Sequence, residues 1–271
     1  MPLRQNVIVI FDLHVNQSLV PHDELYALAE AIDEGAFETL WVLDHFAALQ
    51  ENVTHPMLDP FVLLGALAAK TKSLRLGILV ANVVNRQPAV LAQASTSLQF
   101  MSNSRFTLGL GAGASPTSRF AAEHHSLGIE LRKKMTDRHA YLVHSVQTIR
   151  SIWQRESSTT PLIVAPQTEP NITIGVNSSE LAVLAAQLSC SINIRWNHES
   201  LSTIVAKYRT EATKCGTQAN ISVWMPWSLT HTKSQAAITP LADQGVDRVI
   251  FLTTEQQHFS ELMNLGSFSF P

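Results

Sequence analysis

The fold of this chain is decided by the stretch Thr39-Leu40-Trp41-Val42-Leu43-Asp44-His45-Phe46. Its first five residues, Thr39–Leu43, form a short apolar run that predicts a buried strand. Upstream, Pro21–Glu34 has the periodicity of a helix, and Val7–Phe11 is another apolar run. Strand, helix and strand in this order predict a βαβ unit, whose two strands lie parallel in one sheet.

The same alternation continues to the end of the chain and gives eight strand candidates in total. The remaining strands are predicted at Leu74–Val80, Phe106–Leu110, Ile172–Val176, Cys190–Ile194, Ile221–Trp224 and Arg248–Leu252, and the remaining helices at Pro60–Lys70, Ala89–Phe100, Thr136–Trp153, Ser179–Leu188, Glu199–Lys214 and Ser234–Gln244. This favours a closed (β/α)8 TIM barrel over an open doubly wound sheet. Such a barrel typically needs about 250 residues, so residues 1–271 are expected to form a single domain. The polar stretch Ala114–Leu131 predicts an insertion after the fourth strand.

Composition restricts the partners that this chain is expected to have. Only 15% of its residues are charged, against a typical value of about 25%, which predicts extensive burial and a homodimer. A net charge of −3 and the lack of a basic run argue against nucleic acid. Two cysteines and no long apolar run predict a cytoplasmic protein without a membrane span. The eleven histidines show no metal-ligand spacing, and His124 and His125 are expected to be solvated in a loop.

The dipeptide Asp44-His45 stands at the end of the second predicted strand. In parallel barrels the carboxyl ends of the strands form the catalytic mouth. A histidine there can exchange a proton near neutral pH, and a neighbouring carboxylate can fix its tautomer. Without further context the alternative is structural, with Asp44 capping the next element and His45 packing under a loop.

Two glycine-containing segments point to a ligand that carries phosphate. Gly109–Ala114 has the G-x-G-x-x-G/A spacing of dinucleotide-binding turns, but Ser115-Pro116 interrupts the helix that should follow, so a glycine turn at the barrel mouth is the alternative. Gly175, Val176 and Asn177 lie between a strand and a helix, where backbone amides could hold an anion. Simple N-capping by Ser178 or Ser179 explains the same pattern.

Polar side chains also follow the third predicted strand. Asn82, Asn85 and Arg86 could present hydrogen-bonding groups to a ligand, and Pro88 then begins the next helix. No G-x-S-x-G elbow is present in the sequence, so the pattern gives little support to nucleophilic hydrolysis.

Three ordered motifs resemble those of the bacterial-luciferase-like superfamily, most closely its actinobacterial branch that uses the deazaflavin coenzyme F420. These motifs are LWVLDHF at Leu40–Phe46, LGILVANVVNRQP at Leu76–Pro88 and RFTLGLGAG at Arg105–Gly113. The resemblance is clear from about Leu25 to Trp153 and fainter beyond. It implies a luciferase-like TIM barrel that binds coenzyme F420, with FMN as the alternative cofactor.

The resemblance also implies roles for particular residues. Asp44 and His45 match the pair beside the reactive face of the cofactor ring, and Leu79-Val80 matches a non-prolyl cis peptide that backs this ring. Ala112 and Gly113 match residues that line the cofactor beside the ring or its side chain, and Gly175, Val176 and Asn177 match the loop that receives the cofactor phosphate. Asn82 is a further cofactor-binding candidate because of its place after the third predicted strand. No metal site is implied.

The chain departs from the family pattern at three places. Around Gly175 the usual second glycine of the family is replaced, and a later A-D-G-like motif reads Leu188-Ser189-Cys190-Ser191, which puts the phosphate site in doubt. Ala114-Ser115 stands where sugar-phosphate dehydrogenases of the family carry an acidic proton donor, which puts that chemistry in doubt. Trp224-Met225-Pro226-Trp227 leads almost directly to the last helix and strand, which predicts a shortened late half.

The activity predicted from the sequence is F420H2-dependent hydride transfer to a small organic acceptor. In this hypothesis His45 balances the proton or charge, and Asp44 orients His45. The alternatives are an FMN-dependent monooxygenase of the same fold and a noncatalytic barrel subunit of a heteromeric oxidoreductase. A nicotinamide dehydrogenase is a third and weaker alternative, because only the glycine loop supports it.

Overall fold

The computed structural model describes residues 9–35, 37–48, 55–154, 165–227 and 238–264. Its eight strands are all parallel and close into a barrel in sequence order, with β8 paired to β1. The strands are β1 (Ile10–Val15), β2 (Thr39–Val42), β3 (Arg75–Asn82), β4 (Phe106–Gly111), β5 (Asn171–Gly175), β6 (Ser191–Arg195), β7 (Ile221–Pro226) and β8 (Arg248–Leu252). The predicted (β/α)8 TIM barrel is thereby confirmed.

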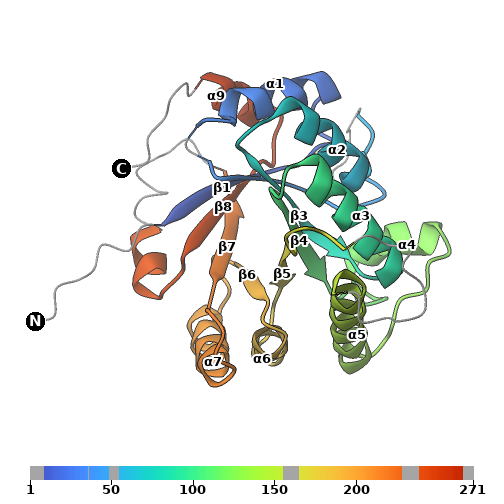
Figure 1. Ribbon diagram of the computed structural model, residues 1–271, viewed down its shortest axis with the longest axis vertical. Helices are drawn as coiled ribbons and strands as arrows, with labels where there is room; N and C mark the ends of the chain where they lie inside the picture. The colour runs from blue at the N-terminus through green and yellow to red at the C-terminus, as the bar shows by residue number, and fades with distance from the viewer. Residues whose placement is uncertain (1–8, 36, 49–54, 155–164, 228–237, 265–271) are drawn as a thin grey trace, which may run out of the picture.

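Helices lie outside the strands and alternate with them along the chain (Figure 1). The described helices are α1 (His22–Ile32), α2 (Pro60–Lys70), α3 (Pro88–Met101), the 3-10 turn η1 (Arg119–Ala121), α4 (Ala122–Ser126), α5 (Met135–Trp153), α6 (Ser179–Gln187), α7 (Leu201–Lys214) and α9 (Gln257–Asn264). Within the described ranges, none of these helices is both long and apolar enough to cross a membrane. Of the helix predicted at Ser234–Gln244, residues 234–237 lie outside the described residues, and residues 238–243 are helical. The predicted late shortening falls largely outside the described residues.

The two faces of β2 show how the apolar run builds the barrel. Leu40 and Val42 are fully buried in the large core that includes residues of the helices, whereas Trp41 belongs to a second, smaller cluster with Leu79 and Ile250. Successive strand residues point to opposite faces, so Trp41 faces the barrel interior. Its ring occupies space that a side chain at Gly77 would need, since a Cβ there would lie 2.4 Å from the Trp41 ring.

The first strand differs from its prediction, because β1 continues through Asp12 and His14 to Val15. Residues 7 and 8 of the predicted run lie outside the described residues. Asp12 is fully buried and accepts a hydrogen bond from Trp41 Nε1 at 2.8 Å and from Arg248 at 2.5 Å. Burial raises the pKa of Asp12 to about 6, while Arg248 and Trp41 act in the opposite direction. The apolar pattern missed these residues because their partners are distant in sequence.

Strand β3 carries an irregularity where it faces β4. The pairing register shifts between Ile78 and Ala81, and the peptide bond Leu79-Val80 is cis, as the resemblance implied. The Val80 side chain lies close to two strand glycines: a Cβ at Gly111 would be 2.6 Å from Val80 Cγ2, and one at Gly175 would be 3.2 Å from Val80 Cγ1. Val80 therefore fills the barrel interior between β4 and β5.

The segment after β4 is an insertion, as predicted, but it is not a simple polar loop. It forms η1 and α4, and one side of α4 is buried. His124 is only 1% exposed, so the expectation that it is solvated is wrong, whereas His125 is exposed. The insertion packs a polar helix against the mouth of the barrel, and local polarity does not reveal this contact.

Candidate active site

A pocket of about 310 Å³ lies at the carboxyl ends of β2, β3 and β4. Its walls come from these strand ends and from the insertion after β4. The lining residues are Leu43, Asp44, His45, Leu79, Val80, Asn82, Gly111, Ala112, Gly113, Ala114, Phe120, Glu123 and His124. The structure thus brings together seven of the ten predicted site residues, including both Asp44 and His45.

His45 is held by a carboxylate from the insertion. Its Nδ1 lies 2.7 Å from Glu123 Oε1, and the Glu123 side chain is only 7% exposed. The other carboxylate oxygen, Glu123 Oε2, accepts hydrogen bonds from the backbone amides of Phe46 at 2.8 Å and Ala47 at 3.1 Å. Glu123 therefore ties the residues that follow β2 to α4.

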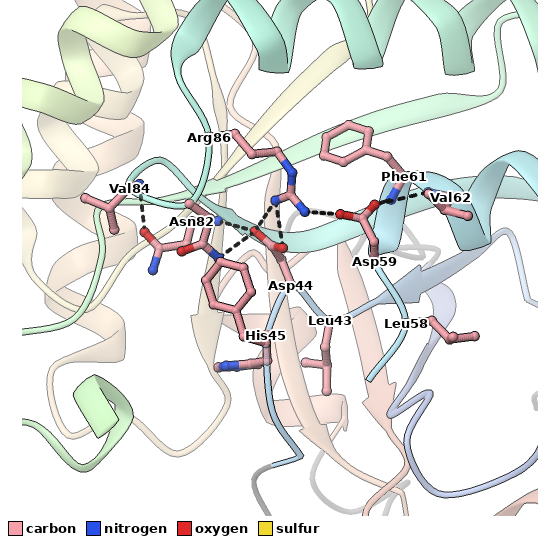
Figure 2. Close-up of polar contacts among 12 residues, drawn as sticks. Leu43, Asp44, His45, Leu58, Asp59, Phe61, Val62, Asn82, Val84 and Arg86 are labelled. Carbon is pink, nitrogen blue, oxygen red and sulfur yellow. Dashed lines mark hydrogen bonds and ion pairs between the residues drawn. The ribbon is translucent and has the colours of Figure 1, made fainter. Parts of the chain in front are cut away.

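The Asp44 carboxylate is committed to a different partner. Both of its oxygens accept hydrogen bonds from Arg86 Nη1, at 2.8 and 2.9 Å. Oδ2 also accepts from the backbone N–H of Asn82 at 2.9 Å. Figure 2 shows Arg86 between Asp44 and Asp59, while the His45 ring lies away from this cluster. The prediction that Asp44 orients His45 is therefore wrong in this structure, and Glu123 makes that contact.

The electrostatics of Arg86 agree with a buried ion-pair network. Burial by itself would lower the pKa of Arg86, but Asp44 and Asp59 outweigh it and raise this pKa above its ordinary value. The Asp44 side chain is 2% exposed and that of Arg86 15%. Arg86 thus holds the loop between β3 and α3 rather than facing a ligand, as the sequence suggested.

A second polar group, centred on His124, extends from this network to the pocket. Asn85 donates to Asp44 Oδ2 through Nδ2 at 3.2 Å, and its Oδ1 lies 2.9 Å from His124 Nε2. Asn82 Nδ2 lies 3.2 Å from the same ring nitrogen. His124 Nδ1 is buried and has no hydrogen-bond partner among the described residues, although Glu123 Oε1 lies 3.9 Å away.

The rest of the pocket lining is largely apolar and built partly from backbone. Leu79, Val80, Ala112 and Ala114 form it, together with Gly111 and Gly113. Gly113 has a φ of 88°, which favours glycine, and a Cβ there would lie 3.1 Å from Val84 Cγ2. A pocket with a mainly apolar lining and a few polar side chains could hold a flat ring that has polar atoms along one edge.

The predicted phosphate loop, Gly175–Asn177, fits its assigned role less well than the pocket residues fit theirs. The Val176 amide donates to the Asn193 carbonyl at 2.9 Å and Ser178 Oγ accepts from Leu181 N at 3.3 Å, so neither group is free for an anion. The pKa of Glu180 is lowered because its carboxylate accepts hydrogen bonds from the Glu180 backbone amide and from the Ser178 hydroxyl. A carboxylate therefore stands at the start of α6. The structural alternative, N-capping by Ser178, is confirmed.

Glu123 is the residue of this site that the sequence did not reveal. It lies 78 residues after His45, inside a stretch that reads as a polar loop, and no local pattern separates it from the exposed Glu130. Over the ranges that the structure covers, no cluster of three His, Cys, Asp or Glu side chains could hold a metal ion.

A closed parallel barrel with a pocket at the carboxyl ends of its strands is the architecture of TIM-barrel proteins. Comparison with known proteins identifies the group more closely. Residues 8–262 match the family model described as luciferase-like monooxygenase, so the chain belongs to this family.

Two curated relatives show the range of proteins that this chain is similar to. The F420-dependent hydroxymycolic acid dehydrogenase of Mycobacterium tuberculosis is 30% identical over 49% of this chain and 35% of its own length. The 4-hydroxyprotoasukamycin monooxygenase of Streptomyces nodosus subsp. asukaensis is 33% identical over 38% of this chain and 25% of its own length. The matched part of this chain thus covers between a quarter and just over a third of the length of these relatives.

Among solved structures, an F420-dependent secondary alcohol dehydrogenase in complex with an F420-acetone adduct has a similar fold. The TM-score is 0.77 at 14% sequence identity, with 95% of this chain and 98% of that chain covered. At this identity the similarity concerns the fold alone.

Proposed function

We propose that this protein is an oxidoreductase that binds reduced coenzyme F420 and transfers a hydride to a small organic acceptor. The observation that carries the proposal is the pocket at the ends of β2 to β4, which is lined both by apolar residues and by a histidine that a buried carboxylate holds. When bound, the deazaflavin would supply a hydride donor that reacts poorly with oxygen. The F420-dependent relative supports this choice of cofactor.

The residues of the pocket divide the work between binding and proton transfer. Val80, Ala112 and Gly113 would contact the ring, as proposed from the sequence, and His45 would hold or move a proton at its edge. His124 also lines the pocket, and its ring nitrogen Nε2 is held by Asn85 and Asn82. Asp44 would act indirectly, since its carboxylate holds Asn82, Asn85 and Arg86 in place.

The charged tail of the cofactor is the weaker part of the fit. Gly175 and Asn177 remain candidates for contact with a phosphate, but Val176 does not offer its amide and Glu180 would repel an anion at this helix start. We therefore expect cofactor affinity to depend on salt and on the charge of Glu180. A Glu180→Gln variant should bind the cofactor more tightly than the wild type.

Titration of the purified protein with F420 and with FMN, followed by absorbance and fluorescence, tests the cofactor. An Ala112→Trp variant should lose binding because its indole fills the pocket, while Ala206→Trp, on the exposed side of α7, serves as the matched control. Binding of neither cofactor to the wild type would refute the proposal. Equal binding to both tryptophan variants would place the cofactor elsewhere.

An FMN-dependent monooxygenase is the second candidate, and the monooxygenase relative supports it. The two activities differ in what accepts the electrons. Oxygen consumption that depends on reduced FMN would favour the monooxygenase, whereas anaerobic oxidation of reduced F420 by an added carbonyl compound would favour hydride transfer.

A further inference from the structure

The carboxylate of Glu123 has a fixed hydrogen-bonding pattern. Oε2 accepts from two backbone amides, those of Phe46 and Ala47, and amides can only donate. Oε1 lies 2.7 Å from His45 Nδ1. Because an ionised carboxylate can only accept, this short contact requires a proton on His45 Nδ1. Nε2 is then the only ring nitrogen of His45 that can gain or lose a proton.

We propose that Glu123 is the positioning residue of His45: it holds the proton on Nδ1 and thereby assigns proton exchange to Nε2. This inference rests on the proposed function and deepens it, because it names the chemistry that the acceptor must have. Glu123 contacts neither the acceptor nor the reacting atoms in this scheme. It acts through the ring of His45.

The assignment defines a balanced reaction for an acceptor with a polarised double bond, such as a carbonyl or an imine. The acceptor carbon would gain a hydride with its two electrons as the carbon–heteroatom π bond breaks, and the reduced cofactor, when bound, would supply that hydride. The heteroatom takes one proton from Nε2 of the His45 imidazolium, which becomes neutral and regains a proton from solvent. Glu123 stays ionised throughout and stabilises the imidazolium before the transfer.

Replacing Glu123 with glutamine tests the assignment because the site can orient the new side chain in only one favourable way. The amides of Phe46 and Ala47 require an oxygen, so the side-chain carbonyl of glutamine would face them and its NH2 group would face His45 Nδ1. That ring nitrogen must then accept, and the proton moves to Nε2. The variant should therefore hold the opposite tautomer of neutral His45 with almost unchanged packing.

Nitrogen-15 NMR of the histidine rings measures this tautomer in the protein without cofactor. The His45 signals are assigned as those missing from a His45→Asn variant. In the wild type the neutral ring should carry its proton on Nδ1, and in Glu123→Gln on Nε2. Glu130→Gln, which changes an exposed carboxylate of the same segment, should retain the wild-type tautomer.

A wild-type spectrum with the proton on Nε2 would overturn the inference, even if Glu123→Gln failed to fold. A folded Glu123→Gln protein that keeps the proton on Nδ1 would overturn it as well. Once an acceptor is found, the variant should lose about 100-fold in kcat with little change in KM, as expected for removal of acid–base catalysis. Absence of turnover would count against the proposed function, whereas the NMR result would stand independently.

Discussion

Replacement of Asp44 with asparagine separates the role that the sequence suggested for this residue from the one that the structure shows. The wild-type carboxylate accepts two hydrogen bonds from Arg86, one from the Asn82 amide and one from Asn85. In the variant, Oδ2 would remain an oxygen because two donors face it, so the new NH2 group would point at Arg86. Arg86 would keep its hydrogen bond to Oδ2, but it would lose the bond to Oδ1 and the negative charge of its partner, and a donor would face it in their place.

The size of the effect follows from burial. Removing one partner of a buried ion pair costs about 3–5 kcal/mol, because the remaining charge is left without compensation. Arg86 keeps its contact with Asp59, and its side chain is 15% exposed, so the lower end of this range applies. A loss of about 3 kcal/mol in a chain of this size lowers Tm by about 6–12 °C.

Asp59→Asn is the matched control, since Asp59 binds the same guanidinium but its side chain is 43% exposed. Asparagine also preserves the cap that Asp59 provides to the amides of Phe61 and Val62 at the start of α2. This variant should therefore lose at most about 1 kcal/mol. Thermal and urea unfolding, followed by circular dichroism, measures both variants.

The result that would refute this reasoning is an Asp44→Asn protein that melts within 2 °C of the wild type. If that stable protein also changed the tautomer of His45, Asp44 would regain the orienting role that we assign to Glu123. If instead stability falls while the tautomer is kept, Asp44 acts by holding the loop between β3 and α3.

Three further predictions concern packing, pH and assembly. Gly109→Ala should lower the free energy of unfolding by about 3 kcal/mol or more, because its Cβ would lie 2.1 Å from the Ile78 carbonyl oxygen. The control Gly65→Ala, in α2, would place its Cβ no closer than 3.5 Å to another atom and should raise the free energy of unfolding by about 0.5–1 kcal/mol. Chemical denaturation measures both variants. Burial, together with His45, lowers the pKa of His14 to about 3, so its contribution to stability is lost as pH falls below the unfolded value of 6.5. Between pH 7 and pH 5 the wild type should lose about 2 kcal/mol more than His14→Leu in urea unfolding, and equal losses would show that His14 is not buried as a neutral ring. Light scattering after size-exclusion chromatography should give twice the mass of one chain if the predicted homodimer forms, and the mass of one chain would contradict it.

Local patterns in the sequence were sufficient for the architecture. The alternation of apolar runs with helical periodicity placed all eight strands to within a few residues, because side-chain period and turn chemistry act over short stretches. The motif LWVLDHF also located the barrel mouth, since the carboxyl ends of parallel strands meet at one edge. The cis peptide at Leu79-Val80 came from the resemblance to a known family and is present in the structure.

The partners of the polar side chains were decided only by the tertiary structure. Asp44 and His45 are adjacent in the chain, yet their side chains bind residues 42 and 78 positions away. Asp12 likewise depends on Arg248, 236 residues distant, which is why the polar end of β1 escaped the apolar pattern. Hydrogen bonds act over about 3 Å, so their partners are set by how closure of the barrel and packing of α4 bring remote segments together. The sequence by itself determined the barrel and the place of its mouth, and the packing of the insertion determined which carboxylate serves His45.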